Sequence, residues 1–295
     1  MPDRLQHQQE VQAFLQGHFS IADWRLTIPE GTGHETYFAH GDGHDYFVKL
    51  GVQTARYEEM AEMGLAPQVL ADGSLEDGTS IVVQPLVEGR TPSRKDYRNH
   101  LEQFAATIDR THHSPELRRV LSEVPSERYC VVASDRLAQI RQRWDRCKPQ
   151  VPAEAAFVDE SFDLLAQQAQ GLSGTGLVAS HNDICNANWL VTPQGRLYLI
   201  DLELMSLDDP AVDIGATLWW YYPPELRRRF LEIVGYAGDE PFRMRMRVRM
   251  AMHCLNIILP RDGSFDRFDA ASFGESLTDF RAALAGKDNP QGYGD

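Results

Sequence analysis

Cysteine and long apolar runs are scarce in this sequence, and each absence narrows what the chain can be. Only four of the 295 residues are cysteine, and no two of them form a Cys-x-x-Cys pair: Cys130, Cys147, Cys185 and Cys254. This usage excludes a disulfide scaffold and a zinc ribbon, and it is typical of a reducing, cytoplasmic compartment. No apolar run reaches the ~18 residues of a membrane-spanning helix. The polar start MPDRLQHQQE lacks the apolar segment of a secretory signal.

Positive charge is scarce too, since 29 Lys and Arg residues stand against 43 Asp and Glu residues, for a net charge of −14. An acidic surface disfavours nucleic acid as a partner. It suits a cationic ligand, although plain solubility is the simpler explanation. No G-x-x-x-x-G-K-[ST] motif occurs, so a phosphate-binding loop of that type is excluded.

The predicted secondary structure changes character once along the chain. Strand-like runs come first, in residues 24–28, 36–39, 46–50 and 80–87. The Gly-Asp-Gly sequence at 41–43 predicts a hairpin turn between two of them. After a linker-like stretch at 88–93, apolar residues recur with helical spacing, and Ser93 is a candidate N-cap. Strands followed by helices predict an α+β fold.

We expect two lobes and a short tail from this pattern. Residues 1–88 form the expected first lobe, and residues 89–285 form the second. The polar, turn-rich residues 286–295 are expected to be a flexible tail.

The most informative segment is residues 180–203. Two strand-like runs, 188–192 and 197–201, are joined by the loop residues 193–196. If Thr192, just before this loop, pairs with Leu197, just after it, Asn188 lies opposite Asp201. Two oxygen-bearing side chains at the open end of a hairpin could hold a hard cation such as Mg²⁺.

The same segment begins with His181-x-Asp183, followed after four residues by Asn188. The pattern H-x-D-x-x-x-x-N belongs to phosphoryl-transfer loops, in which the Asp accepts a hydroxyl proton and the Asn holds a metal. Asp201 then stands where a second, metal-binding Asp is expected. The alternative is a loop in which Asp183 and Asn186 only form Asx-turns, which leaves Asp201 unexplained.

These residues resemble the aminoglycoside phosphotransferase and choline kinase superfamily. The resemblance rests on residues 181–188, 199–203 and 208–215 and extends over about residues 24–220. It implies a two-lobed protein-kinase-like fold, with a small β-rich nucleotide-binding lobe and a larger, mainly helical lobe for catalysis and acceptor binding. It also implies Asp183, with His181, as the catalytic residue, Asn188 and Asp201 as ligands of Mg²⁺, and ATP or GTP as phosphoryl donor.

The rest of the nucleotide site is expected in the first lobe. Lys49 lies in an apolar strand, where a lysine needs a partner, and it matches the phosphate-binding strand lysine of kinases. Its expected partner is Glu58, with Glu59 and Glu62 as alternatives.

Two further contacts to the nucleotide are expected. Gly31 and Gly33 stand where a phosphate-covering loop belongs, although a simple β-turn would also explain them. Gln84 and Leu86 resemble the hinge that binds the nucleotide base.

The acceptor is expected to be a small molecule, because the chain lacks an A-P-E activation segment after Glu203. Trp219, with Glu203 and Asp208, could bind a cationic substrate, although a helix packed into the core is the alternative. The predicted function is Mg²⁺-dependent transfer of a γ-phosphoryl group to a small hydroxyl compound. An aminoglycoside or other antibiotic and an amino alcohol such as choline remain open. The alternative is a nucleotide-binding regulatory protein without transfer activity, and neither nucleic acid nor membrane is an expected partner.

Overall fold

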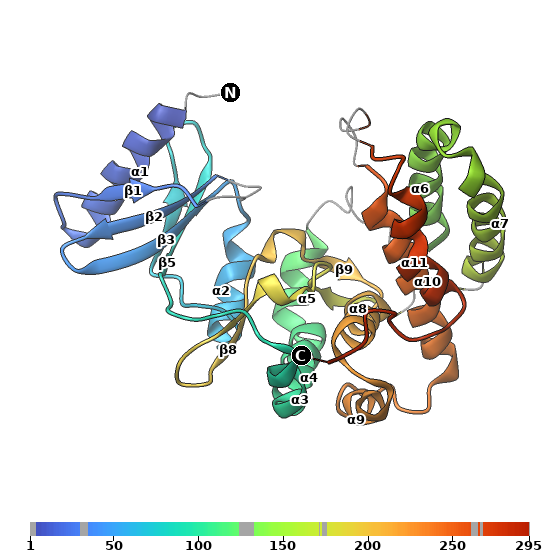
Figure 1. Ribbon diagram of the computed structural model, residues 1–295. Coiled ribbons are helices and arrows are strands. Elements are labelled where there is room, and N and C mark those ends of the chain that lie inside the picture. Colours follow the sequence, from blue (N-terminus) through green and yellow to red (C-terminus); the bar gives the residue numbers. More distant parts are fainter. Residues whose placement is uncertain are drawn as a thin grey trace. The chain divides into compact units, whose positions relative to one another are not determined.

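The structure, a computed structural model, describes residues 4–29, 35–123, 133–170, 172, 176–260, 265 and 268–294. The chain folds into two compact units (Figure 1). The first contains Met1–Thr91 and Ala187–Glu203, and the second contains Pro92–Asn186 and Leu204–Asp295. Gly31 and Gly33 lie outside the described residues.

The first unit is built on a five-stranded antiparallel sheet with the order β1-β2-β3-β5-β4. Its strands are β1 (Arg25–Thr27), β2 (Thr36–Gly41), β3 (His44–Leu50), β4 (Ala71–Ser74) and β5 (Ser80–Pro85). The expected hairpin turn is confirmed: Asp42 and Gly43, with φ of 48° and 75°, connect the paired residues Gly41 and His44. Positive φ at both loop residues matches the twist of a two-residue hairpin.

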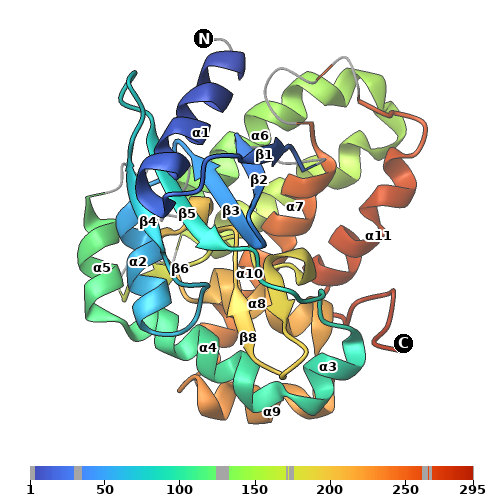
Figure 2. The same ribbon diagram turned by 90° about the vertical axis from the view of Figure 1, so that its left-hand side faces the viewer.

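Two helices belong to the first unit, α1 (Arg4–Phe19) and α2 (Thr54–Glu62). The helix α1 lies along one face of the sheet (Figures 1 and 2). Val11 and Leu15 on this helix are fully buried and join a cluster with alternate sheet residues such as Tyr37, Val48 and Ile81. The cluster is the core that fixes the sheet, and with it the position of β3.

The hairpin of the 180–203 segment forms with a register one residue away from the expected one. In β7 (Trp189–Val191) and β8 (Leu197–Leu199), Val191 pairs with Leu197 and Trp189 with Leu199. The prediction that Asn188 opposes Asp201 was therefore wrong. The reason lies in the loop. The Thr192 amide donates to the Arg196 carbonyl over 2.9 Å, so that only three residues connect the paired positions, one fewer than expected. Gly195, the last of the three, adopts a φ of 77° that closes this short connection.

The second unit is mainly helical. Its helices are α3 (Arg94–Asn99), α4 (Leu101–His113), α5 (Pro115–Ser122), α6 (Ala133–Cys147), α7 (Pro152–Ala169), α8 (Ala211–Tyr221), α9 (Pro224–Ile233), α10 (Glu240–Ile258) and α11 (Phe273–Leu284). A short 3-10 turn, η2 (Lys148–Gln150), also belongs to this unit, and two more, η3 (Asn186–Asn188) and η4 (Leu202–Leu204), lie where the chain passes from one unit to the other. One antiparallel pair joins β6 (Val178–Ser180) to β9 (Ser206–Asp208). Ser93 caps α3 as predicted, in a reciprocal capping box with Asp96.

Side chains from α6, α7, α8, α10 and α11 form one large core in the second unit. The α+β fold predicted from the sequence is confirmed. Across the described part of the chain, no helix combines the length and apolar character needed to span a bilayer.

The tail after α11 contacts the second unit. Arg98 donates to the carbonyl of Tyr293 over 2.8 Å, and Arg227 pairs with Asp288 over 2.8 Å. The indole of Trp219 donates to the carbonyl of Lys287 over 3.3 Å. These contacts lay the tail against the ends of α3, α8 and α9.

Candidate active site

The predicted catalytic loop follows β6 in the second unit. Its second residue, Asn182, has a φ of 65°, which is a strained backbone conformation for a residue with a side chain. The side-chain amide of Asn182 offsets this strain, since its Nδ2 donates to Ser206 Oγ over 2.8 Å and to the Leu204 carbonyl over 3.1 Å. The loop is thereby tied to the strand β9.

Asp213, in the first turn of α8, fixes the same loop from the other side. Its carboxylate accepts hydrogen bonds from the backbone amides of His181 (2.7 Å) and Asn182 (2.8 Å) and from Nε2 of His112 (2.9 Å). Burial alone would raise the pKa of Asp213. The hydrogen bond and charge of His112, with the His181 contacts, outweigh burial, so the pKa of Asp213 is lowered. Asp213 thus stays ionised and holds the loop backbone.

His181 and Asp183 have different surroundings. The His181 side chain is fully buried, and its Nδ1 accepts a hydrogen bond from the backbone amide of Asp183 over 3.3 Å. An accepting Nδ1 on a neutral ring places the proton on Nε2. His181 therefore orients the backbone at Asp183, whereas the Asp183 side chain lines a cavity.

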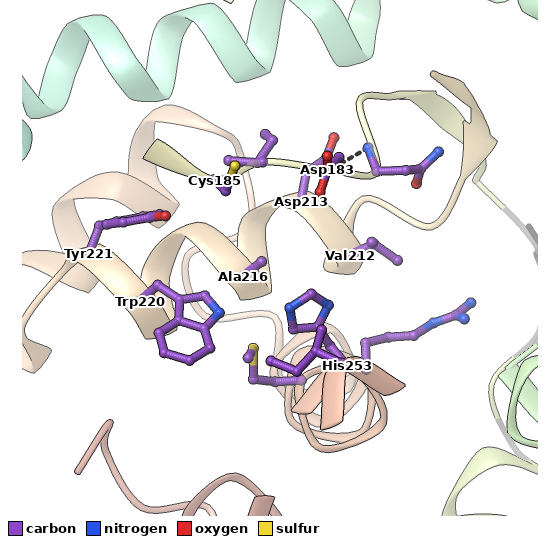
Figure 3. Close-up of a pocket in the computed structure, with 13 residues that line it drawn as sticks. Asp183, Cys185, Val212, Asp213, Ala216, Trp220, Tyr221 and His253 are labelled. Carbon is purple, nitrogen blue, oxygen red and sulfur yellow. Dashed lines mark hydrogen bonds between the residues drawn. The ribbon is translucent and has the colours of Figure 1, made fainter. Parts of the chain in front are cut away.

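This cavity has a volume of about 290 Å³ and lies within the second unit. The loop contributes Asn182, Asp183, Ile184 and Cys185; α8 contributes Val212, Asp213, Ala216, Trp220 and Tyr221; and α10 contributes Arg249, Met250, His253 and Ile257. Figure 3 shows Ala216 in the middle of the labelled residues, with Asp183 and Cys185 on one side and Trp220 and His253 on the other. A small side chain at this position leaves the space open.

Most of the charge at the cavity wall is already compensated. Arg249 lies 3.7 Å from Asp209 and 3.9 Å from Asp208, and Asp213 is bound as described above. Burial lowers the pKa of His253, although the Asp183 charge opposes the shift, so the ring is neutral at pH 7. Asp183 is the carboxylate that the catalytic loop contributes to the cavity wall.

Two of these wall residues, Trp220 and His253, were missed from the sequence. The helical spacing held the signal, because Val212, Ala216 and Trp220 recur at intervals of four and share one face of α8. The neighbouring Trp219 does not line this cavity and is 7% exposed. Its burial is at odds with the predicted substrate contact.

Two of the predicted site residues, Asp201 and Glu203, contact Lys49, which is 6% exposed on β3 of the first unit. Its Nζ lies 2.7 Å from Oδ1 of Asp201 and forms a second ion pair with Glu203. The hydroxyl of Tyr57 donates to Glu203 over 2.7 Å. Burial, followed by the charge of Glu203, raises the pKa of Tyr57, which keeps this hydroxyl protonated.

The expected Lys49–Glu58 pair is absent, so that prediction was wrong. The buried face of α2 carries Arg56, Tyr57 and Met60, which places Glu58 on the exposed face. Arg56 on the inner face binds the carbonyl of Glu203 over 2.8 Å. Glu203 takes the place of the expected partner, and its burial with Lys49 is at odds with the predicted substrate contact.

Asp208, the third predicted substrate residue, is also inside the protein at 3% exposure. Burial raises its pKa to about 6 against the lowering effect of Arg249. Its Oδ1 accepts a hydrogen bond from the backbone amide of Asp209 over 2.7 Å. Asp208 therefore supports the end of β9 and does not line the cavity beside Asp183.

Asn188 and Asp201 provide oxygen donors of the kind that Mg²⁺ prefers. Asn188 is 7% exposed, and its carbonyl accepts from the backbone amide of Ile200 over 2.9 Å. Asp201 has a φ of 63° just after β8, and its side chain is 48% exposed. Within the described residues no group of three or more His, Cys, Asp or Glu side chains could form a metal cage. A carboxylate and a carboxamide fit Mg²⁺, which also takes phosphate oxygens and water.

The two expected hinge residues lie at the end of β5. Gln84 is buried, and its side chain donates to the Pro67 carbonyl over 2.7 Å. The Leu86 amide donates to the Asp45 carbonyl over 2.9 Å, which extends the pairing with β3. Both contacts fix the backbone of this segment within the first unit.

Comparisons with known proteins agree with this picture. A model of the phosphotransferase enzyme family matches residues 24–248. A choline kinase, LicA from Streptococcus pneumoniae, is 16% identical, with a TM-score of 0.63 over 95% of this chain and 99% of that one. The AMP-bound spectinomycin phosphotransferase APH(9)-Ia is 14% identical, with a TM-score of 0.62 over 94% of this chain and 96% of that one.

A third similar structure is the GDP complex of an aminoglycoside 2′-phosphotransferase IIIa variant. It is 15% identical, with a TM-score of 0.67 over 96% of this chain and 98% of that one. At such identities the structures show the fold, whereas the family match covers most of the sequence. The chain therefore belongs to the phosphotransferase enzyme family, as its catalytic-loop motif predicted, and is a small-molecule phosphotransferase.

Proposed function

We propose that this protein transfers the γ-phosphoryl group of ATP or GTP, with Mg²⁺, to a hydroxyl of a small molecule bound in the cavity beside Asp183. The observation that carries the proposal is the Asp183 carboxylate. It lines a cavity of about 290 Å³, and its loop is fixed by Asp213 and by His181. A carboxylate held at a ligand-sized cavity is suited to act as a general base.

In this proposal the acceptor oxygen forms a bond to the γ-phosphorus while the bond to the leaving β-phosphate oxygen breaks. Asp183 accepts the proton that the acceptor hydroxyl loses. His181 is a positioning residue, because it touches the Asp183 backbone and is itself fully buried. The fixed loop means that the base is oriented before the acceptor arrives.

The nucleotide residues of the proposal belong to the first unit. Lys49 would bind phosphate oxygens, and Asn188 and Asp201 would hold Mg²⁺, which supplies positive charge against the phosphates. Lys49 is paired with Asp201 and Glu203. Glu203 would keep the ammonium group of Lys49 in place while Asp201 holds the metal. We also assign the base of the nucleotide to the segment around Gln84 and Leu86, and its phosphates to the stretch containing Gly31 and Gly33.

The character of the cavity favours a compact acceptor with an apolar part. Trp220, Met250 and Ile257 supply apolar surface, and Ile257 is 52% exposed at the cavity wall. A polycation such as an aminoglycoside needs several free carboxylates, whereas Asp213 is fully engaged here. We therefore propose an alcohol with at most one positive charge, such as an amino alcohol whose cation can rest on the Trp220 ring.

A release assay for ADP and GDP tests this proposal and finds the acceptor class. Each nucleotide is incubated with Mg²⁺ and one acceptor at a time: neutral alcohols, choline and other amino alcohols, sugars, and aminoglycosides. We expect turnover with compact alcohols that disappears in Asp183→Asn. Preferred turnover with aminoglycosides would contradict the acceptor class. Tight nucleotide binding without any turnover would favour the regulatory alternative.

A further inference from the structure

A second cavity in the second unit carries an unusual concentration of positive charge. Its volume is about 360 Å³, and it is bounded by α8, α9, α10, α11 and the tail. Its wall contains five basic residues and no Asp or Glu: Arg227, Arg228, Arg243, Arg247 and Lys287. In a chain with a net charge of −14, such a wall is not explained by composition. We propose that this cavity binds a small organic anion with an apolar body.

The cavity is separate from the one beside Asp183. At 100° per residue, Gly215, Leu218 and Trp219 form a face of α8 whose centre lies about 130° around the helix from that of Ala216 and Trp220. The first three line the basic cavity, and the last two line the acceptor cavity. Met250 of α10 lines both, so the two cavities share a wall.

Three of the five cations have carboxylate partners. Arg227 pairs with Asp288 over 2.8 Å, Arg228 with Glu232 over 3.1 Å, and Arg243 with Glu240 over 3.3 Å. These partners lie outside the cavity wall and compensate the charge locally. The anion is therefore expected at the remaining two cations.

Arg247 and Lys287 have no carboxylate partner among the residues that the structure describes. The guanidinium group of Arg247 packs against Gly286, where a Cβ atom would collide with it. Gly286 follows the end of α11 with a φ of 65°, which glycine adopts without strain. It also has no Cβ atom that would collide with the guanidinium group. The guanidinium group thus lies directly beside the residue that precedes Lys287.

The backbone of Lys287 is fixed at this place. Its amide donates to the Ala282 carbonyl over 2.9 Å, and the Gly286 amide donates to Ala283 over 3.0 Å, which together form a Schellman motif. The Lys287 carbonyl accepts from the Trp219 indole. Two like charges held on one cavity wall repel each other, and an anion bound to both relieves that repulsion.

The remaining wall defines the rest of the ligand. Its apolar members are Leu218, Trp219, Pro224, Leu231, Met246, Met250 and Ala283. The volume lies within the range of small-molecule sites. An aromatic or branched aliphatic body on these side chains, with a phosphate, sulfonate or carboxylate group at Arg247 and Lys287, satisfies both parts of the wall.

Calorimetric titration with 1-naphthyl phosphate tests the proposal without any measurement of kinase activity, so its failure leaves the proposed function untouched. The titration is done with saturating Mg²⁺ and ADP, which occupy the nucleotide site. We expect binding to the wild-type protein that weakens as NaCl is raised from 20 to 200 mM. We expect 1-naphthol and inorganic phosphate, which each carry one half of the probe, to bind more weakly.

Matched variants locate the binding. Arg247→Gln and Lys287→Gln each remove one charge and are expected to weaken binding about tenfold, the step that corresponds to one exposed charged contact. Arg247→Lys keeps the charge and is expected to retain most of the affinity. Arg228→Gln removes a charge from the same wall that Glu232 already compensates, so affinity should stay within about twofold.

Two results would overturn the proposal. One is the absence of 1-naphthyl phosphate binding to the wild-type protein at millimolar concentration. The other is unchanged affinity in the double variant Arg247→Gln, Lys287→Gln. Both side chains are exposed, so the variants are expected to fold, and a thermal melt of each confirms that the comparison is between folded proteins.

Discussion

Replacing Asp213 by Asn should disturb the catalytic loop more than any surface substitution. The carboxylate is fully buried and accepts hydrogen bonds from two backbone amides and from His112. An Asn side chain has one acceptor oxygen, so its amino group would face one of these donors. One buried donor loses its partner, and the remaining hydrogen bonds no longer go to a charged acceptor. The unsatisfied donor and the weakened charge-assisted hydrogen bonds together cost about 2–5 kcal/mol.

Urea denaturation followed by tryptophan fluorescence measures this loss at pH 7. Asp145→Asn is the matched control, because Asp145 pairs with Arg141 on the surface and is 56% exposed. Its loss should be within about 1 kcal/mol. The reasoning is refuted if Asp213→Asn and Asp145→Asn lose the same small amount, since Asp213 would then not hold the loop.

The pH dependence provides a second check on Asp213. Its pKa is lowered in the folded state, so the contribution to stability is complete above the unfolded pKa of about 4. That contribution is lost as the pH falls through the folded pKa. The wild-type protein should therefore lose stability more steeply than Asp213→Asn below about pH 4. Parallel acid limbs for the two proteins would contradict the assignment.

Three further predictions follow from the same contacts. Lys49→Met leaves Glu203 buried without its cation and should destabilise the protein by about 3–5 kcal/mol. Glu58→Gln, on the exposed face of α2, is the control and should change stability by less than about 0.5 kcal/mol. Urea denaturation of the two variants measures both free energies of unfolding. Ala216→Leu fills the acceptor cavity and should raise the KM for the acceptor while the nucleotide Kd stays unchanged. If both constants rose by the same factor, the cavity would not be the binding site of the acceptor. The pKa of Asp208 is raised to about 6, so its ionisation opposes folding increasingly between about pH 4 and 6. The stability of Asp208→Asn relative to wild type should therefore rise over this range. A melting-temperature difference that stays constant with pH would contradict the raised pKa.

Where the chemistry depends on local spacing, the sequence was sufficient to predict the family and to name candidate site residues. The His181-x-Asp183 pattern, Asn188 after four intervening residues and the strand position of Lys49 are all fixed within a few residues of chain. The family and the α+β fold follow from them and are confirmed. The roles assigned to the individual residues remain predictions.

The hairpin register could not be predicted because it depends on the backbone of one residue. With Gly195 at positive φ, the loop has three residues and Asn188 moves out of register with Asp201. A one-residue slip reverses the side chains of a strand. Asp201 leaves the strand with its own positive φ, so the pleat alone does not determine where its carboxylate points.

Contacts between distant segments were the other limit. Lys49 and Glu203 are far apart in the sequence, and the helix next to Lys49 offered several glutamates as partners. Likewise, positions 219 and 220 both carry tryptophan, and only the packing of α8 against α10 decides that Trp220 lines the cavity beside Asp183. Such choices depend on tertiary packing, which a single sequence does not contain.

The role of Asp183 as the base is the central claim, and one comparison tests it most directly. With the acceptor identified by the release assay, kcat and the Kd of the Mg²⁺–nucleotide complex are measured for wild type and Asp183→Asn. Removing a positioned base should lower kcat by at least about 10²-fold, while the nucleotide Kd and the thermal melt stay unchanged. A variant that keeps wild-type kcat would contradict the proposed mechanism.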